Sequence, residues 1–278
     1  MLMKTRASRS GKRPRWRMGY DPPAIAETVS RTVKTTQYSA QASRLLVRRW
    51  LNPLLERGSR WLAPTAWLQG RELLYQNLVH RDLDRLGIAT PFYPLRSAAS
   101  YSYLYLLLRL VQDHDGLNVL ELGAGQSTIL LDQLAASRDL NLTSLEHDAG
   151  WADRIGEQVS STIHHAPLAE RRFADHRFDG YDPAVLEGAS GFNLLLVDGP
   201  RRSRRRSRWT GLEFLESVMD DEFVVIFDDA ERRGEIQTIS KALKLLDARG
   251  VKYGVHLTRS INSQFLIATP RFEAALYY

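Results

Sequence analysis

Short runs of hydrophobic residues recur through the second half of the chain, separated by longer stretches of roughly helix length. The runs cover residues 119–122, 142–146, 162–166, 192–197 and 223–227. Because the runs at 119–122, 192–197 and 223–227 are apolar at nearly every position, the pattern predicts strands that are buried on both faces, as in a parallel sheet covered by helices.

The last runs follow a different pattern. Residues 235–248 have helical spacing, and after them residues 252–258 and 263–269 are joined by the short turn 259–262. Two strand-like runs so close together predict an antiparallel hairpin at one end of the sheet. We therefore expect a doubly wound α/β fold with a mostly parallel seven-stranded sheet and a C-terminal antiparallel hairpin.

The N-terminal part shows helical spacing instead. Apolar residues recur every three to four positions at Leu45, Leu46, Trp50, Leu54 and Leu55, and then at Leu73, Leu74, Leu78, Leu83 and Leu86. This spacing predicts two amphipathic helices. A third helix is expected over residues 97–112, and it is buried because residues 101–111 are mostly apolar yet too few to cross a bilayer.

Three parts of the chain are predicted from these patterns. Residues 1–40 form a basic, flexible leader, residues 41–96 form a helical segment that acts as a cap or an oligomer contact, and residues 97–278 form the α/β domain. The composition, 44% hydrophobic and 25% charged, is that of a soluble globular protein. No transmembrane span or secretory signal is predicted, so we expect a cytoplasmic location.

The absence of cysteine excludes thiolate zinc sites and cysteine nucleophiles. The net charge of +6 is concentrated in residues 4–17, which hold no acid, and in residues 201–208, which hold six arginines. Both segments favour an anionic partner. For the first, a solvated tail competes with a nucleic-acid or membrane contact. In the second, Arg201, Arg208 and Trp209 are candidate substrate-binding residues, because guanidinium groups pair with phosphate or carboxylate; a solvated loop is the alternative.

The first predicted strand runs into a glycine-containing loop with the sequence ELGAGQST at residues 121–128. Gly123 and Gly125 let the backbone turn tightly and approach a ligand, and the helix that follows supplies free N–H groups. The loop therefore predicts a nucleotide-like ligand. Thr128 stands where a dinucleotide fingerprint has its third glycine, which disfavours NAD.

The second predicted strand ends at Glu146, which is followed by His147 and Asp148. An acid at the end of the second strand, about twenty residues past such a loop, can accept hydrogen bonds from ribose hydroxyls. We therefore predict that Glu146 binds a ribose.

Four segments resemble, in order, the motifs of class I S-adenosylmethionine-dependent methyltransferases. They are NVLELGAGQST at 118–128, TSLEHD at 143–148, NLLLVDGP at 193–200 and VIFDD at 225–229. The resemblance implies that the loop holds the methionine part of S-adenosylmethionine, that Glu146 holds its ribose and that residues 165–168 flank its adenine. The residues predicted to contact this cofactor are Glu121, Gly123, Ala124, Gly125, Ser127, Thr128, Glu146, His147 and Asp198.

The acids that end the fourth and fifth strands are the candidate catalytic groups. Methyl transfer requires an aligned nucleophile and, for a hydroxyl, removal of its proton. The resemblance to metal-dependent O-methyltransferases implies that Asp198, Asp228 and Asp229 bind a divalent cation such as Mg²⁺. The plant and catechol-type enzymes have Asp-Asn in place of Asp228-Asp229, so a metal-free interpretation stays open, in which Asp198 or Asp229 is the base. Arg232 and Arg233 are candidate counter-charges.

The predicted reaction is O-methylation of a small-molecule or saccharide-type acceptor, which can be anionic. Enzymes of this fold that methylate base amines carry a Pro-Pro-aromatic motif where this chain has Asp198-Gly199-Pro200. The alternative is a nucleic-acid methyltransferase or nucleic-acid-binding module that uses the basic arm and the arginine loop; its affinity would fall steeply with salt. An aminopropyl transferase is disfavoured because an acidic polyamine pocket is not evident.

Overall fold

The computed structural model describes residues 63–88, 92, 99–200 and 207–278. These residues belong to one unit that covers residues 59–278. Three sequence predictions lie outside the described residues: the helix at 42–61, the basic leader with its arm at 4–17, and the arginine-rich loop up to residue 206, including Arg201.

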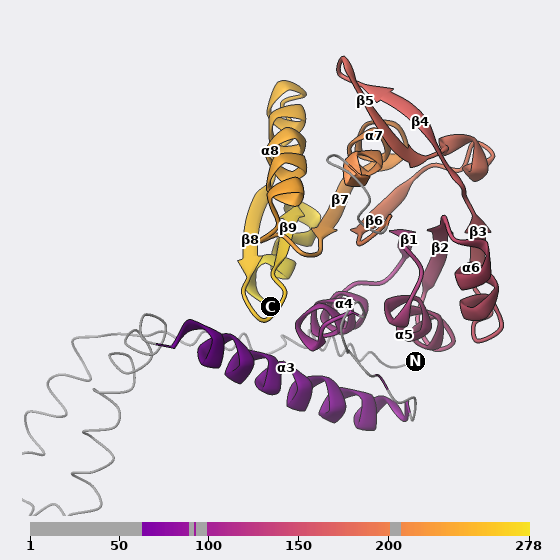
Figure 1. The fold of residues 1–278 in the computed structure, drawn as a ribbon. Coiled ribbons are helices and arrows are strands. Elements are labelled where there is room, and N and C mark those ends of the chain that lie inside the picture. The colour runs from indigo at the N-terminus through magenta and orange to yellow at the C-terminus, as the bar shows by residue number, and fades with distance from the viewer. Residues whose placement is uncertain (1–62, 89–91, 93–98, 201–206) are drawn as a thin grey trace, which may run out of the picture. The chain divides into compact units, whose positions relative to one another are not determined.

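The centre of the unit is a seven-stranded sheet with the strand order β3-β2-β1-β6-β7-β9-β8 (Figure 1). Its strands are β1 (Leu117–Leu122), β2 (Leu140–Glu146), β3 (Thr162–His165), β6 (Phe192–Val197), β7 (Met219–Phe227), β8 (Gly254–Thr258) and β9 (Gln264–Ala268). The first five strands in that order pair in parallel, whereas β9 is antiparallel to both β7 and β8. The predicted fold class and the C-terminal hairpin are confirmed.

Helices cover both faces of the sheet. One hydrophobic cluster joins the sheet to α3 (Pro64–Leu86), α4 (Tyr101–Asp113), α5 (Gln126–Ala135) and the 3₁₀ segment η3 (Pro270–Tyr277). A second cluster joins the other face to α7 (Thr210–Ser217) and α8 (Arg233–Ala248). In β6, Leu194 and Leu196 enter the first cluster while Leu195 and Val197 enter the second. Because side chains alternate between faces, burial on both sides explains why the strand sequences are continuously apolar.

Helix α4 is buried, as its sequence predicts. Tyr103, Leu104, Leu107 and Leu110 are all fully buried, and Ser100 caps the helix by accepting the N–H of Tyr103 at 3.3 Å. Its position between α3 and the sheet explains why it is apolar on almost every side.

Helix α3 packs through only part of the predicted set of leucines. Leu73 and Leu74 are 59% and 56% exposed, whereas Tyr75, Val79 and Leu83 are buried against α4. Leu83 belongs to the predicted set, and Leu78 and Leu86 of that set pack partly buried against the same cluster. The leucine pattern did not single out Tyr75 and Val79, which precede Leu83 at intervals of four residues.

Residues 167–191 hold a β-hairpin where a helix-length segment was expected. Strands β4 (Leu168–Phe173) and β5 (His176–Tyr181) form a separate antiparallel pair, followed by the short 3₁₀ turn η1 (Pro183–Leu186). Ala174 and Asp175 join the strands with φ of 43° and 65°. Two consecutive positive φ values match the right-handed twist of a tight hairpin. Only α6 (Ala149–Gly156) separates β2 from β3, and it packs along both.

The carboxyl ends of the parallel strands meet at one edge of the sheet, and the functional residues lie along it. In sheet order, the edge carries Glu146 after β2, the glycine loop after β1, Asp198 after β6 and Asp228 after β7. Since β8 and β9 are antiparallel to each other, the turn between them, residues 259–262, reaches the same edge.

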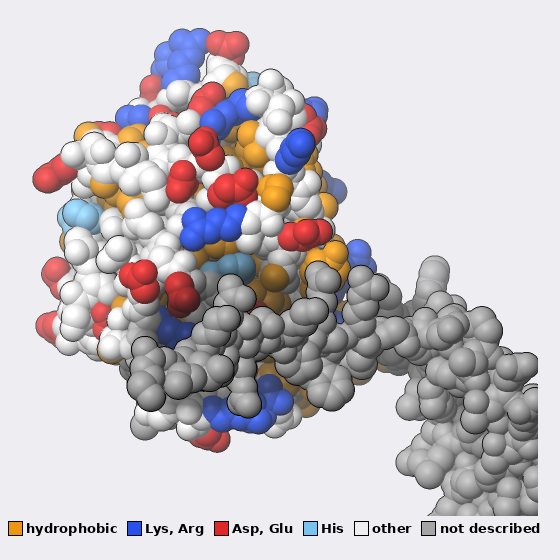
Figure 2. Space-filling model, turned by 180° about the vertical axis from the view of Figure 1, so that it is seen from behind, with side chains coloured by type: hydrophobic (Ala, Val, Ile, Leu, Met, Phe, Trp, Pro, Cys, Tyr) orange, Lys and Arg blue, Asp and Glu red, His pale blue; other side chains and the backbone are white. Residues whose placement is uncertain are grey.

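Two further observations concern the surface. None of the described helices is long and apolar enough to cross a membrane. On the face opposite to that of Figure 1, basic and acidic side chains lie interspersed rather than gathered by sign (Figure 2). Of the basic segments that suggested a nucleic-acid partner, residues 4–17 and 201–206 are outside the described residues.

Candidate active site

The glycine loop contacts the loop that follows β6. Gly123 has a φ of 98°, and a Cβ placed on it would lie 2.9 Å from the Cα of Gly199. The N–H of Gly199 donates in turn to the carbonyl of Leu122. Gly125, the residue before α5, has open space where a Cβ would be. Gly123 is therefore required for contact between the two loops, and Gly125 leaves room for a ligand at the start of α5.

Glu121 lies beneath this loop and is fully buried. Its Oε1 accepts the hydroxyl of Ser127 at 2.5 Å, and its Oε2 accepts the hydroxyls of Thr128 at 2.6 Å and Ser144 at 2.7 Å. Burial raises the pKa of Glu121 to about 7, against the opposing effect of the three hydroxyls. These bonds hold the first turn of α5 against β1 and β2.

The side chains of Glu121, Ser127 and Thr128 were expected to contact the cofactor, but the structure turns them toward one another under the loop. Thr128 Oγ1 also accepts the N–H of Gly125 at 2.8 Å. What the loop offers a ligand is instead backbone N–H at the beginning of α5, where the helix dipole is positive. These side chains are positioning residues.

Replacing Glu121 with glutamine should change how stability depends on pH. Its pKa is about 7 in the folded protein and 4.5 ordinarily, so the folded state holds the proton more tightly and the wild type loses stability as pH rises from 4.5 through 7. Glutamine does not titrate. We therefore expect the difference in unfolding free energy, variant minus wild type, to be about 3 kcal/mol larger at pH 8 than at pH 4. Urea unfolding at both pH values measures this difference. Glu157→Gln, an exposed change, is the control and should keep the same difference from the wild type at both pH values. If Glu121→Gln also keeps the same difference at both pH values, the raised pKa of Glu121 is contradicted.

Glu146 joins the second strand to the glycine loop. Its Oε2 accepts the N–H of Ala124 at 3.2 Å, and its Oε1 accepts the N–H of Asp148 at 2.9 Å. The Nδ1 of His147 lies 2.7 Å from the same Oε1. A carboxylate has about four acceptor positions, and the N–H groups of Ala124 and Asp148 occupy two of them, because His147 Nδ1 forms no hydrogen bond. The two N–H groups orient Glu146 and leave positions for two hydroxyls of a ligand.

The predicted adenine region also lies beside Glu146. His165 pairs with Glu146 in the register of β2 and β3, and the N–H of Ala166 donates to the carbonyl of Glu146 at 2.7 Å. Trp151 of α6 donates its indole N–H to the carbonyl of Ala124 at 2.7 Å while its ring is 39% exposed. The structure thus brings the glycine loop, the second-strand acid and the end of β3 together, with an aromatic ring at their rim that the sequence did not single out.

Buried polar atoms without a partner gather along this edge. Among the described residues, the hydroxyls of Tyr103 and Tyr181 have no hydrogen-bond partner. Burial, and then the negative charge of Asp198, raise the pKa of Tyr103; burial, and then the charges of Glu146 and Asp198, raise that of Tyr181. Buried polar groups are normally paired, so two unpaired hydroxyls beside these acids indicate a place for a polar ligand. An adenosine-type ligand with several hydroxyl and amine groups fits such a site.

Three aspartates meet at the ends of β6 and β7. Asp198, Asp228 and Asp229 each offer a carboxylate oxygen within 4.8 Å of the others. Asp228 and Asp229 are buried, whereas the side chain of Asp198 is 24% exposed. The cluster predicted from the sequence is therefore present.

A buried arginine already occupies the centre of this cluster. Arg208 Nη2 donates to Asp229 Oδ2 at 2.9 Å, to Asp198 Oδ1 at 3.2 Å and to the Asp198 carbonyl at 2.7 Å. Its Nη1 donates to the carbonyl of Asp228 at 2.7 Å, and its Nε lies 3.8 Å from Glu235. Burial lowers the pKa of this guanidinium, but the charges of Asp198, Glu235 and Asp229 outweigh it and hold that pKa above its ordinary value. Arg208 thus stays charged and ties the ends of β6 and β7 together.

The three aspartates and a divalent cation do not fit together while Arg208 lies there. Two of the carboxylates face its guanidinium, and Asp228 Oδ1 accepts the side-chain amide of Gln264 at 2.8 Å. A cation needs these oxygens as ligands and is repelled by a guanidinium at hydrogen-bond distance from them.

The expected substrate contacts at the end of the arginine-rich loop differ in the structure. Arg208 and Trp209 are 5% and 3% exposed, and Trp209 packs in the hydrophobic cluster beneath α7. Arg208 is a counter-charge for the aspartates. Arg232, which was expected to balance the paired acids, does form an ion pair with Asp229.

The three aspartates influence one another's protonation. Burial, and then the negative charges of Asp198 and Asp229, raise the pKa of Asp228 well above its ordinary range, which favours its neutral acid. Its side chain hydrogen-bonds with Asp198. Burial also raises the pKa of Asp198, although Arg208 opposes the rise. Asp198 thus combines a raised pKa with the most exposed of the three carboxyls.

Comparisons with known proteins concern the fold. No protein-family model matches the chain, and no curated protein has significant similarity to it. Similar solved structures include an O-methyltransferase from Bacillus cereus in complex with SAH, with 14% identity, a TM-score of 0.43, and coverage of 70% of this chain and 90% of that chain. A SAH-bound methyltransferase of Podospora anserina matches with 10% identity, a TM-score of 0.41, and coverage of 69% and 87%. A Pyrococcus furiosus methyltransferase matches with 13% identity, a TM-score of 0.41, and coverage of 72% and 96%. Likeness at this level carries no chemistry, which has to come from the site itself.

Proposed function

We propose that this chain is an S-adenosylmethionine-dependent methyltransferase that methylates an oxygen of a small-molecule or saccharide-type acceptor without a metal ion. The observation that carries the proposal is the contact of Glu146 with the N–H of Ala124, which makes the glycine loop and the second-strand acid one site. A ligand with a ribose at one end and a charged chain at the other would meet the acid and the loop together.

The chain's own groups divide the work of binding. Backbone N–H groups at the start of α5 favour the carboxylate of the methionine part, Glu146 accepts the two ribose hydroxyls, and residues 165–168 lie where the adenine would pack. S-adenosylmethionine, when bound, supplies a methyl group on a positively charged sulfur, and the acceptor oxygen gains the methyl as the carbon–sulfur bond breaks.

Asp198 serves as the base. It is the exposed member of the aspartate cluster, and it accepts the proton that the acceptor hydroxyl loses. Arg208 holds Asp198 in place through its side chain and its carbonyl. The guanidinium also stabilises the negative charges of Asp198 and Asp229.

Calorimetric titration with S-adenosylhomocysteine tests the cofactor site. The wild type should bind one equivalent, and Glu146→Gln should bind at least about tenfold more weakly, because hydrogen bonds from hydroxyls to a carboxylate contribute about 1.5–3 kcal/mol each. Adenosine alone should show the same loss, since the ribose is the group affected. Glu157→Gln, an exposed change at the end of α6, is the matched control and should bind like the wild type. A wild type that shows no saturable binding of S-adenosylhomocysteine would sink the proposal.

A further inference from the structure

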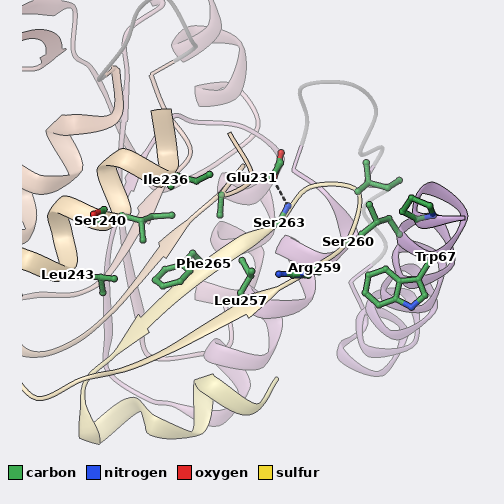
Figure 3. Close-up of a pocket in the computed structure, with 15 residues that line it drawn as sticks. Trp67, Glu231, Ile236, Ser240, Leu243, Leu257, Arg259, Ser260, Ser263 and Phe265 are labelled. Atoms are coloured by element: carbon green, nitrogen blue, oxygen red, sulfur yellow. Dashed lines mark hydrogen bonds between the residues drawn. The ribbon is translucent and has the colours of Figure 1, made fainter. Parts of the chain in front are cut away.

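A cavity of about 660 Å³ opens between the start of α3, helix α8 and the β8–β9 hairpin (Figure 3). Its walls are mainly apolar, and the apolar side chains on them include Trp67, Leu68, Ile236, Leu243, Leu257 and Phe265. Figure 3 shows Trp67 facing it from α3, opposite Ile236 and Leu243 of α8. Small-molecule sites in proteins commonly have about 300–1,000 Å³, so this cavity has the size for a molecule of one or two rings.

Residues that line the cavity directly adjoin the aspartate cluster in the chain. Ala230 and Glu231 line it and directly follow Asp229 in the chain. On the neighbouring strand, Ser263 lines it and directly precedes Gln264, whose amide holds Asp228. The cavity and the candidate base are therefore neighbours along the same edge of the sheet.

The strand order places three groups of residues side by side along the edge of the sheet. The glycine loop and Glu146 lie at β1 and β2, the aspartates at β6 and β7, and the cavity at β9 and β8. Adjacent strands are about 4.8 Å apart, so β6 and β9 are separated by roughly 10 Å. A molecule whose body lies in the cavity would have to extend a hydroxyl over about that distance to meet Asp198 on the cofactor side.

Among the described residues, the cavity wall carries one arginine and one acid, and the arginine can pair with an anionic group of the acceptor. Arg259 lines it, is exposed, and forms no ion pair with any residue that the structure describes. Glu231, the acid on the wall, already accepts the N–H of Ser263 at 2.8 Å. A free guanidinium beside apolar walls suits a carboxylate or sulfonate on an apolar body. A saccharide suits it less, because its hydroxyls would face apolar walls without partners.

We propose that this cavity binds the methyl acceptor, and that the acceptor is an apolar, ring-containing hydroxy compound whose anionic group pairs with Arg259. The proposal rests on the proposed function for the reaction itself. It narrows the acceptor from small molecules in general to one chemical class, and it makes Arg259 a specificity-determining residue.

Two fluorescent probes that differ by one charged group test the cavity. Anilinonaphthalene sulfonate carries an anionic group on an apolar body, and N-phenylnaphthylamine is the same body without the charge. The wild type should bind one equivalent of each. Arg259→Gln should weaken the sulfonate about three- to tenfold, the range of a single partly exposed ion pair, and leave the neutral probe within twofold.

Two matched variants show whether a change in binding belongs to the cavity and to Arg259. Arg172→Gln removes an exposed arginine from β4, away from the cavity, and should change neither probe. Ser240→Trp introduces a large side chain from the exposed wall of α8 and should abolish binding of both. Equal losses of both probes in Arg259→Gln, no loss of either, or unchanged binding to Ser240→Trp would overturn the proposal.

Methyl transfer to 6-hydroxy-2-naphthoate, compared with 2-naphthol, tests that the cavity is the acceptor site. Radiolabelled S-adenosylmethionine should label the naphthoate, and Arg259→Gln should raise its KM about three- to tenfold while the KM for 2-naphthol stays unchanged. If S-adenosylhomocysteine binds but neither compound is labelled, the acceptor assignment is wrong. If S-adenosylhomocysteine itself fails to bind, the proposed function fails, and the probe titrations still decide whether the cavity selects anionic ring compounds.

Discussion

Replacing Arg208 with alanine is expected to create a divalent-cation site that the wild-type protein lacks. The change removes a guanidinium that contacts two carboxylates and leaves Asp198, Asp228 and Asp229 around an empty centre. Without metal, the variant should lose about 3–5 kcal/mol of unfolding free energy, because an ion-pair network is broken in a buried place. Mn²⁺ should restore about 2–3 kcal/mol of it at a concentration near a hundred times its Kd.

Electron paramagnetic resonance of Mn²⁺ measures this directly. The wild type should leave Mn²⁺ free up to about 1 mM, and Arg208→Ala should bind one equivalent well below that concentration. Arg208→Lys keeps a positive charge and is the matched control, which should exclude the ion while losing part of the stability. Stoichiometric Mn²⁺ on the wild type, whatever the variants do, would show that the arginine does not take the place of a metal.

Asp198→Asn is expected to lower kcat by about two to four orders of magnitude, the usual contribution of general base catalysis. The affinity for S-adenosylhomocysteine should stay within threefold, because the amide keeps the shape of the side chain. In the wild type, kcat should fall as pH drops through the raised pKa of Asp198, since a base must be deprotonated to act. Initial rates with 6-hydroxy-2-naphthoate across pH measure both effects.

Asp228→Asn is the matched control for that prediction. Asp228 lies beside Asp198, and its pKa is raised so far that its neutral form is favoured, which asparagine imitates. Its amide can still bond Gln264 and Asp198. We expect less than about a tenfold loss of kcat, because no ionised base is removed. A loss as large as that of Asp198→Asn would place the base at Asp228 instead.

Much of the fold could be predicted because it follows from local properties of the sequence. Strand β6 was predicted with its observed bounds, Phe192–Val197, because a strand buried on both faces is apolar at almost every position; Asn193 is its one polar residue. The glycine loop was predictable for a related reason: a turn that approaches another backbone as closely as Gly123 approaches Gly199 excludes a side chain. In both places, burial or backbone geometry restricts which residue type can stand at the position, so the sequence alone reveals it.

The wrong predictions concern surfaces and partners. In α3, Leu83 is buried as predicted, but Leu73 and Leu74 are exposed, and Tyr75 and Val79 pack against α4 instead. In residues 167–191 a hairpin of half-exposed strands took the place of a helix, because polar residues on its open side obscure the strand pattern. Which face of a helix packs, and whether a segment forms a helix or a hairpin, is determined only by contacts between elements in the folded protein.

Arg208 shows most clearly the difference between what the sequence and the tertiary structure determine. In the sequence it is the last of six arginines and looks like part of a basic, solvent-facing loop. In the structure it is buried among carboxyls that come from the ends of two strands and the start of α8. By itself the sequence determined the sheet, the glycine turn and the acids at the strand ends, because each follows from the local demands of burial and backbone geometry. Only the tertiary structure decided which charges neutralise one another, because ion pairing depends on distances between residues that are far apart in the chain.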